Sequence, residues 1–502
     1  MNSVAIIGAG ITGLTAAFYL KRKGVPVTVY EASGRVGGVI QSIRQDGYLA
    51  EFGPNTLLET SPKITQLIQD AGLASRRLNP DPRAEARYVV RYKRPIEMPA
   101  KPLGFFTTEL FSLGAKLAVV REPFVKPRRE GPEESIAQFV VRRFNQEFLD
   151  HAIDALVAGI YAGDPYKLSL PHAFPKLKAL EDNYGSMIKG QIFGARERKK
   201  RGEVAKDRAP KFSFDEGLQV LPETLCASLG DSMKLNTSVT KLTRTDEGWR
   251  LTIKSPEGRV TRVPDPSAKD GDSQSSSLRE TEADHSAVIF CGTAPSLAKL
   301  EIINGRDGAL RRPDRSSQRD DPTNIDFSAF SGIRYPPVTS VVLGFRREDV
   351  AHPCEGFGML IPRIEGFKIL GTIFSSSLFP NRAPAGHLTL TSYVGGERYP
   401  DLASLPADQL YETTCADLRV LLGVKGKPTF RHHVYYPHAI PQYNVGYGRY
   451  RDLMTEIESK APGLFLAGHY RDGISLSDCI VSGCKVTERV EKHLASSQAV
   501  AK

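Results

Sequence analysis

The sequence predicts a protein of mixed α/β and α+β class, folded as two or three packed domains. The chain has 502 residues, whereas a single hydrophobic core rarely grows beyond roughly 250 to 300 residues. It opens with an apolar run at residues 3–7, a stretch of helical spacing at 12–23 and a second apolar run at 26–30. Such an order of strand, helix and strand is typical of a βαβ unit in a parallel sheet.

Later apolar runs predict strands that return to this opening sheet or build another one. Residues 233–242, 249–254 and 287–291 are expected to form a second set of strands that returns to the first. Residues 464–467 are expected to be a last buried strand. Antiparallel strands are predicted at residues 338–345, 367–374 and 387–393.

Polar segments rich in Pro, Gly and charge interrupt these patterns. We expect exposed loops at residues 121–134, 255–284 and 304–324. Residues 267–284, which include a run of serines, are the best candidate for disorder, and they are expected to form a long hairpin loop between two strands.

Composition and charge exclude several classes of protein. Hydrophobic residues make up 40% and charged residues 25% of the chain, as in soluble globular proteins, and no apolar run approaches the roughly 18 to 20 residues of a membrane-spanning helix. The net charge is +10, but the most basic stretch, residues 196–211, has no aromatic residue to stack on bases, so no nucleic-acid partner is expected. Six dispersed cysteines without a CxxC pair argue against a disulfide framework, and no metal site is expected.

A GxGxxG motif lies directly after the first strand and opens the predicted helix. In this context its glycines permit a tight turn, a close backbone approach to a pyrophosphate and close packing of helix on strand. Glu31 ends the second strand at the expected distance, where its carboxylate can accept hydrogen bonds from a ribose diol. The motif comprises Gly8, Ala9, Gly10, Ile11, Thr12 and Gly13.

The residues after Glu31 separate the two dinucleotides that share this motif, NAD and FAD. Glu31, Arg35, Gly37 and Gly38 form the string E-x3-R-x-G-G, which resembles the amine-oxidase-like flavoprotein superfamily. That resemblance implies FAD, with the arginine beside the diphosphate and the glycines beside the ribityl chain. The C-terminal segment 462–478 resembles the place where this superfamily returns to FAD, with a helix that begins near Ser477 and points at the flavin pyrimidine.

Several short segments follow the FAD motif in a fixed order: GPNT at 53–56, GIYAGD at 159–164, FDEGL at 214–218, GTIFSS at 371–376, IPQY at 440–443 and the stretch 468–483. Through the order of these segments, rather than through any one of them, the chain is similar over nearly its whole length to the oxygen-dependent protoporphyrinogen oxidases.

The resemblance implies a discontinuous Rossmann-like FAD-binding domain, a mixed-sheet substrate domain and a mostly helical, membrane-associated domain. The expected boundaries are 1–85 for the first FAD-binding part, 86–205 for the substrate and helical part, 206–300 for the second FAD-binding part, 301–440 for the substrate-binding sheet and 441–502 for the C-terminal FAD-binding part.

The same resemblance implies the residues that contact FAD beyond the GxGxxG motif. His469 stands where members of the family usually carry a small residue. The implied contacts are Glu31, Ala32, Arg35, Gly37, Gly38, Val39, Gly53, Pro54, Asn55, Thr56, Val239, Gly468, His469, Ile474, Ser475 and Leu476.

For the substrate, the resemblance implies protoporphyrinogen IX, which loses six electrons and six hydrogens to give protoporphyrin IX while FAD reduces O2 to hydrogen peroxide in haem biosynthesis. Arg87 matches an arginine that pairs with a propionate, Phe374 an aromatic residue that packs on a pyrrole ring, and Gly159 a position whose carbonyl faces the macrocycle. The flavin carries the chemistry, so no catalytic acid or base is named among the side chains.

Because the implied substrate and product are apolar, we expect a cytoplasmic protein that is peripherally associated with a membrane. We expect amphipathic helices within residues 103–180 to contact lipid or to form an ordinary core face; the apolar residues are Phe105, Phe106, Leu110, Phe111 and Leu113. A homodimer and hand-over of the product to a ferrochelatase or another chelatase are further expectations.

Three alternative functions stay open. Coproporphyrinogen III oxidation is the same chemistry on a tetracarboxylate and is carried out by close relatives in the same family. An amine oxidase and a non-catalytic flavin- or porphyrin-binding protein are weaker alternatives, and carotenoid-desaturase chemistry fits the segments at 159–164 and 371–376 poorly.

Overall fold

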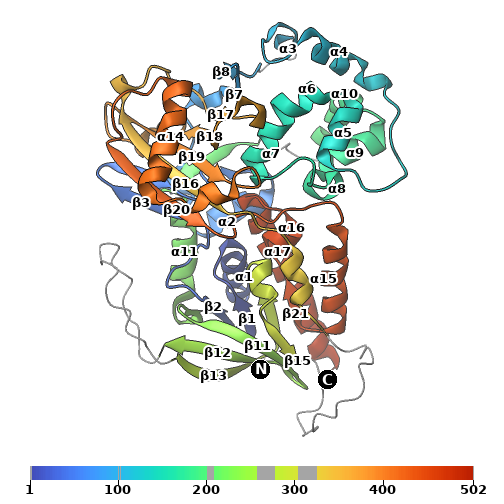
Figure 1. Ribbon diagram of the computed structural model, residues 1–502. Helices are drawn as coiled ribbons and strands as arrows, with labels where there is room; N and C mark the ends of the chain where they lie inside the picture. The colour runs from blue at the N-terminus through green and yellow to red at the C-terminus, as the bar shows by residue number, and fades with distance from the viewer. Residues whose placement is uncertain are drawn as a thin grey trace.

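The structure, a computed structural model, describes residues 3–99, 101, 103–200, 209–256, 278–303 and 325–500. Figure 1 shows a parallel sheet with its helices at the end of the molecule where both termini lie, and a larger sheet and a group of helices side by side at the other end. The predicted loop at 304–324 lies outside the described residues.

A five-stranded parallel sheet forms the centre of the first part. Its strands come from four distant stretches of the chain, in the spatial order β10-β2-β1-β14-β21. This order confirms that 287–291 and the start of 233–242 return to the sheet of the opening βαβ unit, whereas the strand predicted at 249–254 belongs to another sheet. The bounds are β1 Val4–Ile7, β2 Val27–Tyr30, β10 Met233–Lys234, β14 Ala287–Phe290 and β21 Leu464–Leu466.

Both faces of this sheet are covered, as expected for parallel strands. Val4 and Ile6 face a core shared with the helices, while Ala5 faces a second core that contains Trp249 and Met454. The helices packed around the sheet are α1 Ile11–Arg22, α2 Pro62–Asp70, α11 Val220–Leu229, α12 Ala294–Leu297, α15 Gly448–Lys460, α16 His469–Asp472 and α17 Leu476–Val500.

A four-stranded sheet, in the order β13-β12-β11-β15, continues from β10. The prediction of one strand over 233–242 was wrong, because Asn236 adopts a left-handed φ of 52° and the chain passes there from one sheet to the other. The strands on either side of the loop expected at 255–284 pair with each other, but residues 255–256 and 278–284 belong to these strands rather than to the loop. The remainder of that loop, including most of the candidate for disorder at 267–284, lies outside the described residues. The bounds are β11 Ser238–Thr245, β12 Gly248–Pro256, β13 Leu278–His285 and β15 Glu301–Ile303.

A seven-stranded mixed sheet forms the second part, and only its β17–β7 pair is parallel. It contains the three predicted antiparallel strands, and helix α14 (Ala407–Leu422) buries Leu410 and Leu418 against it. In order the strands are β20 Phe430–Tyr436, β16 Val338–Arg346, β19 His387–Gly395, β18 Ile369–Phe374, β17 Gly358–Leu360, β7 Arg87–Arg91 and β8 Arg94–Glu97.

Two small sheets and two short helical turns connect these parts. The hairpin of β3 and β4 follows the βαβ unit, and α13 and the 3-10 turn η9 follow β18. The bounds are β3 Ser42–Gln45, β4 Tyr48–Glu51, β5 Leu57–Leu58, β6 Arg77–Leu78, β9 Lys211–Phe214, α13 Ser375–Leu378 and η9 Pro380–Arg382.

The third part is helical. The prediction that 121–134 is an exposed loop was wrong in part, because Glu122 is fully buried and Glu134 nearly so. Leu110 is also buried, whereas Phe106 and Leu113 are exposed. The bounds are α3 Gly104–Thr107, α4 Leu113–Arg121, the 3-10 turn η3 Glu122–Phe124, α5 Ile136–Arg143, α6 Gln146–Phe148, the π-helical turn η4 Leu149–Ile153, α7 Asp154–Tyr161, α8 Leu170–Ala173, α9 Pro175–Tyr184 and α10 Met187–Lys200.

Among the helices of the described residues, none combines the length and the apolar character needed to cross a membrane. The described residues thus form three larger sheets, two small sheets and a helical part. The domain boundaries given above stay a prediction.

Candidate flavin site

Helix α1 begins directly after β1, and within the part of the chain that the structure describes no side chain caps its N-terminus. Its N-cap residue is Gly10, and the first turn holds no acidic residue. A Cβ atom on Gly13 would lie 2.1 Å from the carbonyl oxygen of Gly8, so only glycine lets the helix approach the turn this closely. The free N–H groups and the positive end of the helix dipole suit an anion such as a dinucleotide pyrophosphate.

Glu31 lies beside this turn at the end of β2. Its Oε2 accepts a hydrogen bond of 2.7 Å from the N–H of Ala9, and its Oε1 accepts 2.9 Å and 2.7 Å bonds from the N–H and hydroxyl of Ser33. The carbonyl of Glu31 also receives the N–H of Thr237, which brings β11 and Val239 to this edge. The carboxylate is therefore held in one orientation beside the glycine-rich turn, with lone pairs left for a ribose.

The loop after Glu31 folds back onto the start of α1. The N–H of Gly37 donates to the carbonyl of Ala9 at 2.9 Å, and a Cβ on Gly38 would lie 3.5 Å from Gly10 Cα. Gly37 has φ 97° and Gly38 φ 59°, conformations that favour glycine. Arg35 donates to the carbonyls of Gly38 and Ile40, so here its guanidinium braces the loop.

The segment 53–56 lies between this loop and the seven-stranded sheet. A Cβ on Gly53 would lie 2.0 Å from the carbonyl oxygen of Val39. The amide of Asn55 donates to the hydroxyl of Tyr393 at 2.7 Å, and that hydroxyl donates to the carbonyl of Gly53 at 3.3 Å. Tyr393 belongs to β19, so the segment connects the loop that follows Glu31 with the seven-stranded sheet.

The C-terminal segment completes the site. Gly468 has φ 113°, and a Cβ there would have Thr12 Oγ1 and the Cys291 carbonyl as nearest neighbours, at 3.8 Å and 3.9 Å. Helix α17 follows, beginning at Leu476 near the predicted position. The hydroxyl of Thr12 donates to the carbonyl of Cys479 at 3.0 Å, which fixes the start of α17 against the start of α1.

His469 is the one predicted contact with an ionisable ring. Its Nε2 lies 3.1 Å from the hydroxyl of Tyr335, which also accepts the N–H of Ala294. Burial lowers the pKa of His469 to about 4, so the ring is neutral near pH 7. Burial also raises the pKa of the Tyr335 and Tyr393 phenols well above 10. These groups hold positions and hydrogen bonds rather than charge.

The three predicted substrate residues gather around one strand of the seven-stranded sheet, β17. Gly358 of β17 is paired with Arg87 on one side and with Ile373, next to Phe374, on the other. A Cβ on Gly159 would lie 2.4 Å from Cδ2 of Leu360, which explains glycine at that point of α7. Arg87 is exposed, whereas Phe374 is fully buried. Their roles toward a substrate stay predictions.

The enclosure of Phe374 adds a detail that the sequence did not contain. Its ring lies 6.0 Å from Tyr88 and 5.7 Å from His352 between ring centroids, in a core of the seven-stranded sheet. A macrocycle would contact this ring only after a side chain beside it moves.

Sequence reasoning missed the polar residues that join the two sheets. Tyr393, Tyr335 and Glu51 lie in strands or loops where they resemble ordinary half-buried residues, and no motif marks them. Alternation along β19 was the only available signal for Tyr393. Nevertheless, the glycines, Glu31 and the C-terminal segment converge on the start of α1, as a bound dinucleotide requires, so the residues present fit FAD.

We expect the substitution His469→Asn to remove a pH dependence of stability. Because the folded state lowers the pKa of His469 to about 4, protonation from the ordinary value of 6.5 downward opposes folding. The free energy of unfolding of the wild-type protein should therefore fall relative to H469N, by up to about 3 kcal/mol, between pH 6.5 and pH 4. Denaturant unfolding at several pH values measures this difference, with His387→Asn as the control. An equal pH dependence in H469N and the wild type would contradict the expectation.

Comparisons with known proteins agree with this geometry. The family model "Flavin containing amine oxidoreductase" matches residues 11–491. Protoporphyrinogen oxidase 2, chloroplastic/mitochondrial, of Arabidopsis thaliana is 34% identical over 98% of this chain and 94% of its own. Coproporphyrinogen III oxidase of Bacillus subtilis is 29% identical over 96% of each chain. A solved structure from Exiguobacterium sp. 255-15 has the same fold, with a TM-score of 0.76 and 21% identity over 98% of both chains.

The family model covers nearly the whole chain, and the glycine-lined start of α1 has the features that a flavin dinucleotide needs. The chain therefore belongs to the family of flavin-containing amine oxidoreductases, and it is an FAD-dependent oxidoreductase.

Proposed function

We propose that this enzyme oxidises protoporphyrinogen IX to protoporphyrin IX, with FAD passing the electrons to O2. The observation that carries the proposal is the direct junction of segment 53–56 with β19, because it brings flavin-binding residues onto the sheet that carries Arg87 and Phe374. The chain is 34% identical to the Arabidopsis protoporphyrinogen oxidase and 29% identical to the Bacillus coproporphyrinogen III oxidase. Both identities support a porphyrinogen as substrate, and the higher one favours protoporphyrinogen.

The chemistry needs little from the side chains. When bound, FAD would supply an acceptor that takes two electrons at a time from the substrate and passes them on to O2. Six electrons and six hydrogens leave protoporphyrinogen in three such steps, so three O2 become three hydrogen peroxide. The chain binds and orients the macrocycle, with Arg87 on a propionate. Since burial keeps Tyr393 and Tyr335 protonated and His469 neutral, none of the three is suited to act as a strong base.

Steady-state oxidation of protoporphyrinogen IX and coproporphyrinogen III, followed by porphyrin fluorescence with peroxide measured in parallel, tests the proposal. We expect protoporphyrinogen to have the higher kcat/KM and three peroxides to form per porphyrin. Arg87→Met should raise KM by about tenfold with a smaller change in kcat, because it removes a charge-assisted contact to a carboxylate.

Arg94→Met is the matched control for this experiment. Arg94 is an exposed arginine on the neighbouring strand β8, and it pairs with Glu109. A preference for coproporphyrinogen would select the alternative substrate, and a protein inactive on both would reject the proposal.

We further propose that the helical part docks on a lipid surface. Exposed apolar side chains gather on α3, α4 and η3 and on α10, and we call them the apolar surface: Leu103, Phe106, Leu113, Leu117, Val120, Phe124, Ile192 and Phe193. Soluble proteins seldom leave such a set exposed without a partner. The exposed cations Lys101, Arg121, Lys126 and Lys189 lie on the same stretches, where they suit anionic headgroups.

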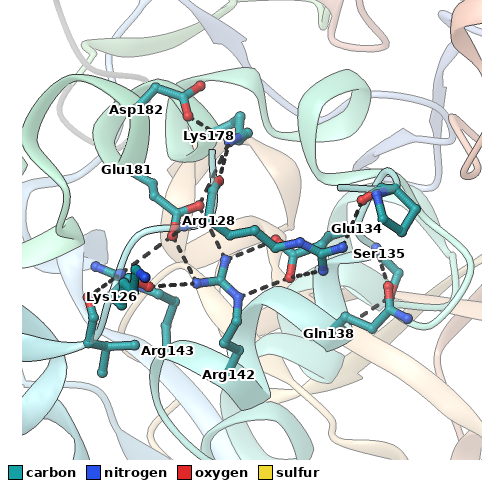
Figure 2. Close-up of polar contacts among 12 residues, drawn as sticks. Lys126, Arg128, Glu134, Ser135, Gln138, Arg142, Arg143, Lys178, Glu181 and Asp182 are labelled. Carbon is teal, nitrogen blue, oxygen red and sulfur yellow. Dashed lines mark hydrogen bonds and ion pairs between the residues drawn. The ribbon is translucent and has the colours of Figure 1, made fainter. Parts of the chain in front are cut away.

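A network of ion pairs holds the helices behind this surface together (Figure 2). Arg142 connects Glu134 at 2.8 Å with Glu181 at 3.0 Å, and Arg143 approaches Glu181 at 3.4 Å. Arg143 also pairs with the fully buried Glu122, which in turn accepts the N–H of Met187 at the start of α10. Because Glu122 follows α4, one carboxylate joins the two halves of the apolar surface, which supports a preformed face rather than a loose one.

Flotation with vesicles of 30% phosphatidylglycerol in phosphatidylcholine tests this docking. We expect the double substitution L117S/F124S to lower the vesicle-bound fraction by about tenfold, because it removes two large apolar side chains from the surface. Val420→Ser is the control, since Val420 is about as exposed as Leu117 but lies on α14. Docking is contradicted if the wild-type protein stays off the vesicles or if the double variant floats with them like the wild type.

A lipid-bound enzyme would also be placed to pass its apolar product to a ferrochelatase or another chelatase. This hand-over, a cytoplasmic location and a homodimer remain part of the proposal.

A further inference from the structure

A buried carboxylate, Glu51, lies at the open end of the β3–β4 hairpin, where one flavin-binding segment enters the hairpin and another leaves it. Glu51 is the last residue of β4 and is 3% exposed. It pairs across the hairpin with Ser42, the first residue of β3. The segment with Arg35 to Val39 comes just before Ser42, and Gly53 comes two residues after Glu51. The position of the Ser42–Glu51 pair therefore affects both segments.

Three donors from three separate parts of the chain converge on this carboxylate. The hydroxyl of Ser42 donates to Oε2 at 2.6 Å. The N–H of Leu218, in the turn after β9, donates to Oε1 at 2.9 Å, and Nη2 of Arg382 donates to the same oxygen at 3.2 Å. A Cβ on Gly217 would lie 2.4 Å from the Ser42 hydroxyl and 2.9 Å from Oε1, so the FDEGL segment needs glycine to close on the pair.

Arg382 carries the contact from Glu51 to the seven-stranded sheet. It is 1% exposed, ends the 3-10 turn η9 that follows β18 and α13, and donates to the hydroxyl of Ser213 at 2.7 Å. Its carbonyl accepts the hydroxyl of Thr389 on β19 at 2.8 Å. The guanidinium therefore touches Glu51 while its backbone is fixed to the strand that carries Tyr393.

We propose that Glu51 is a positioning residue, which through Arg382 holds flavin-binding segment 53–56 at a fixed place against the substrate-binding sheet. The inference rests on the proposed function, because that function makes the seven-stranded sheet the substrate-binding one. A glutamine at this position has the same size and can still accept at the Oε1 position and donate to the Ser42 hydroxyl, but it removes the negative charge that faces the Arg382 guanidinium.

The energetics favour a geometric role over a stabilising one. Burial raises the pKa of Glu51 to about 7 even though Arg382 acts to lower it. Two other charged groups act on Arg382: Arg44 lowers its pKa and Glu216 raises it. Glu51 in turn helps to raise the pKa of Tyr393. Buried ion pairs add little net stability because desolvation offsets their attraction, but they fix the positions of the groups that they join.

The substitution Glu51→Gln tests the proposal, with Glu216→Gln as the matched control. Glu216 lies on the FDEGL turn whose Leu218 donates to Glu51, and its substitution removes only an exposed ion pair with Arg44, of 2.8 Å. The readouts are the Kd for FAD, from titration of the apoprotein, and the visible circular dichroism of the bound flavin. We expect E51Q to raise the Kd by about tenfold and to change the dichroism band, while E216Q changes the Kd by less than about twofold.

Two further variants keep the test decisive. The double variant E51Q/R382Q, which removes both charges, should recover part of the lost affinity, because no buried charge is left without a partner. Arg382→Lys retains the charge without the guanidinium fork, and it decides the question alone if E51Q does not fold. Flavin affinity and dichroism of wild-type values in folded E51Q or R382K would overturn the proposal.

These flavin measurements use no porphyrinogen. An enzyme that fails to oxidise porphyrinogens would therefore reject the proposed function without affecting the outcome for Glu51.

Discussion

The close approach of helix α1 to the turn after β1 is the constraint on which the rest of the site depends. Gly13 leaves no room for a side chain above the Gly8 carbonyl, and three later segments press against the same few residues. Gly38 meets Gly10, the Cys291 backbone meets Gly8, and Gly483 meets the Thr12 carbonyl. Because each of these contacts places backbone against a glycine, no side chain of the glycine stands between the segments and the N-terminus of α1. An extended dinucleotide can then bind along the backbone of these segments at the N-terminus of α1.

The flavin-binding part and the seven-stranded sheet are joined in a different way. Here the contacts are polar and buried: the Asn55–Tyr393 hydrogen bond and the Glu51–Arg382 ion pair. Such contacts contribute less to stability than apolar burial does, but they fix distance and orientation. For a reaction whose difficult step is carried by the flavin, placing a large macrocycle correctly is the main task of the protein. The Asn55–Tyr393 and Glu51–Arg382 contacts therefore determine how the seven-stranded sheet lies against the flavin-binding segments.

The sequence predicted those parts of the molecule that depend on local pattern. The GxGxxG motif, Glu31 and the strands at 287–291 and 464–467 were all readable, because a parallel sheet leaves continuous apolar runs and its turns need glycine. The strand at 233–242 was placed but not its break, since a left-handed Asn236 has no counterpart in hydrophobic periodicity. Buried charges such as Glu122 and Glu51 were missed because their partners lie far away in the chain. The enclosure of Phe374 by Tyr88 and His352 was hidden for the same reason.

Anaerobic mixing of the purified holoenzyme with protoporphyrinogen IX tests the central claim most directly, because it observes electron transfer from this substrate to the flavin without turnover. The oxidised-flavin absorbance and porphyrin fluorescence are followed before and after air is admitted. The account predicts that the flavin band bleaches on mixing, that porphyrin appears, and that the band returns with oxygen. A flavin that stays oxidised with both protoporphyrinogen and coproporphyrinogen would contradict it.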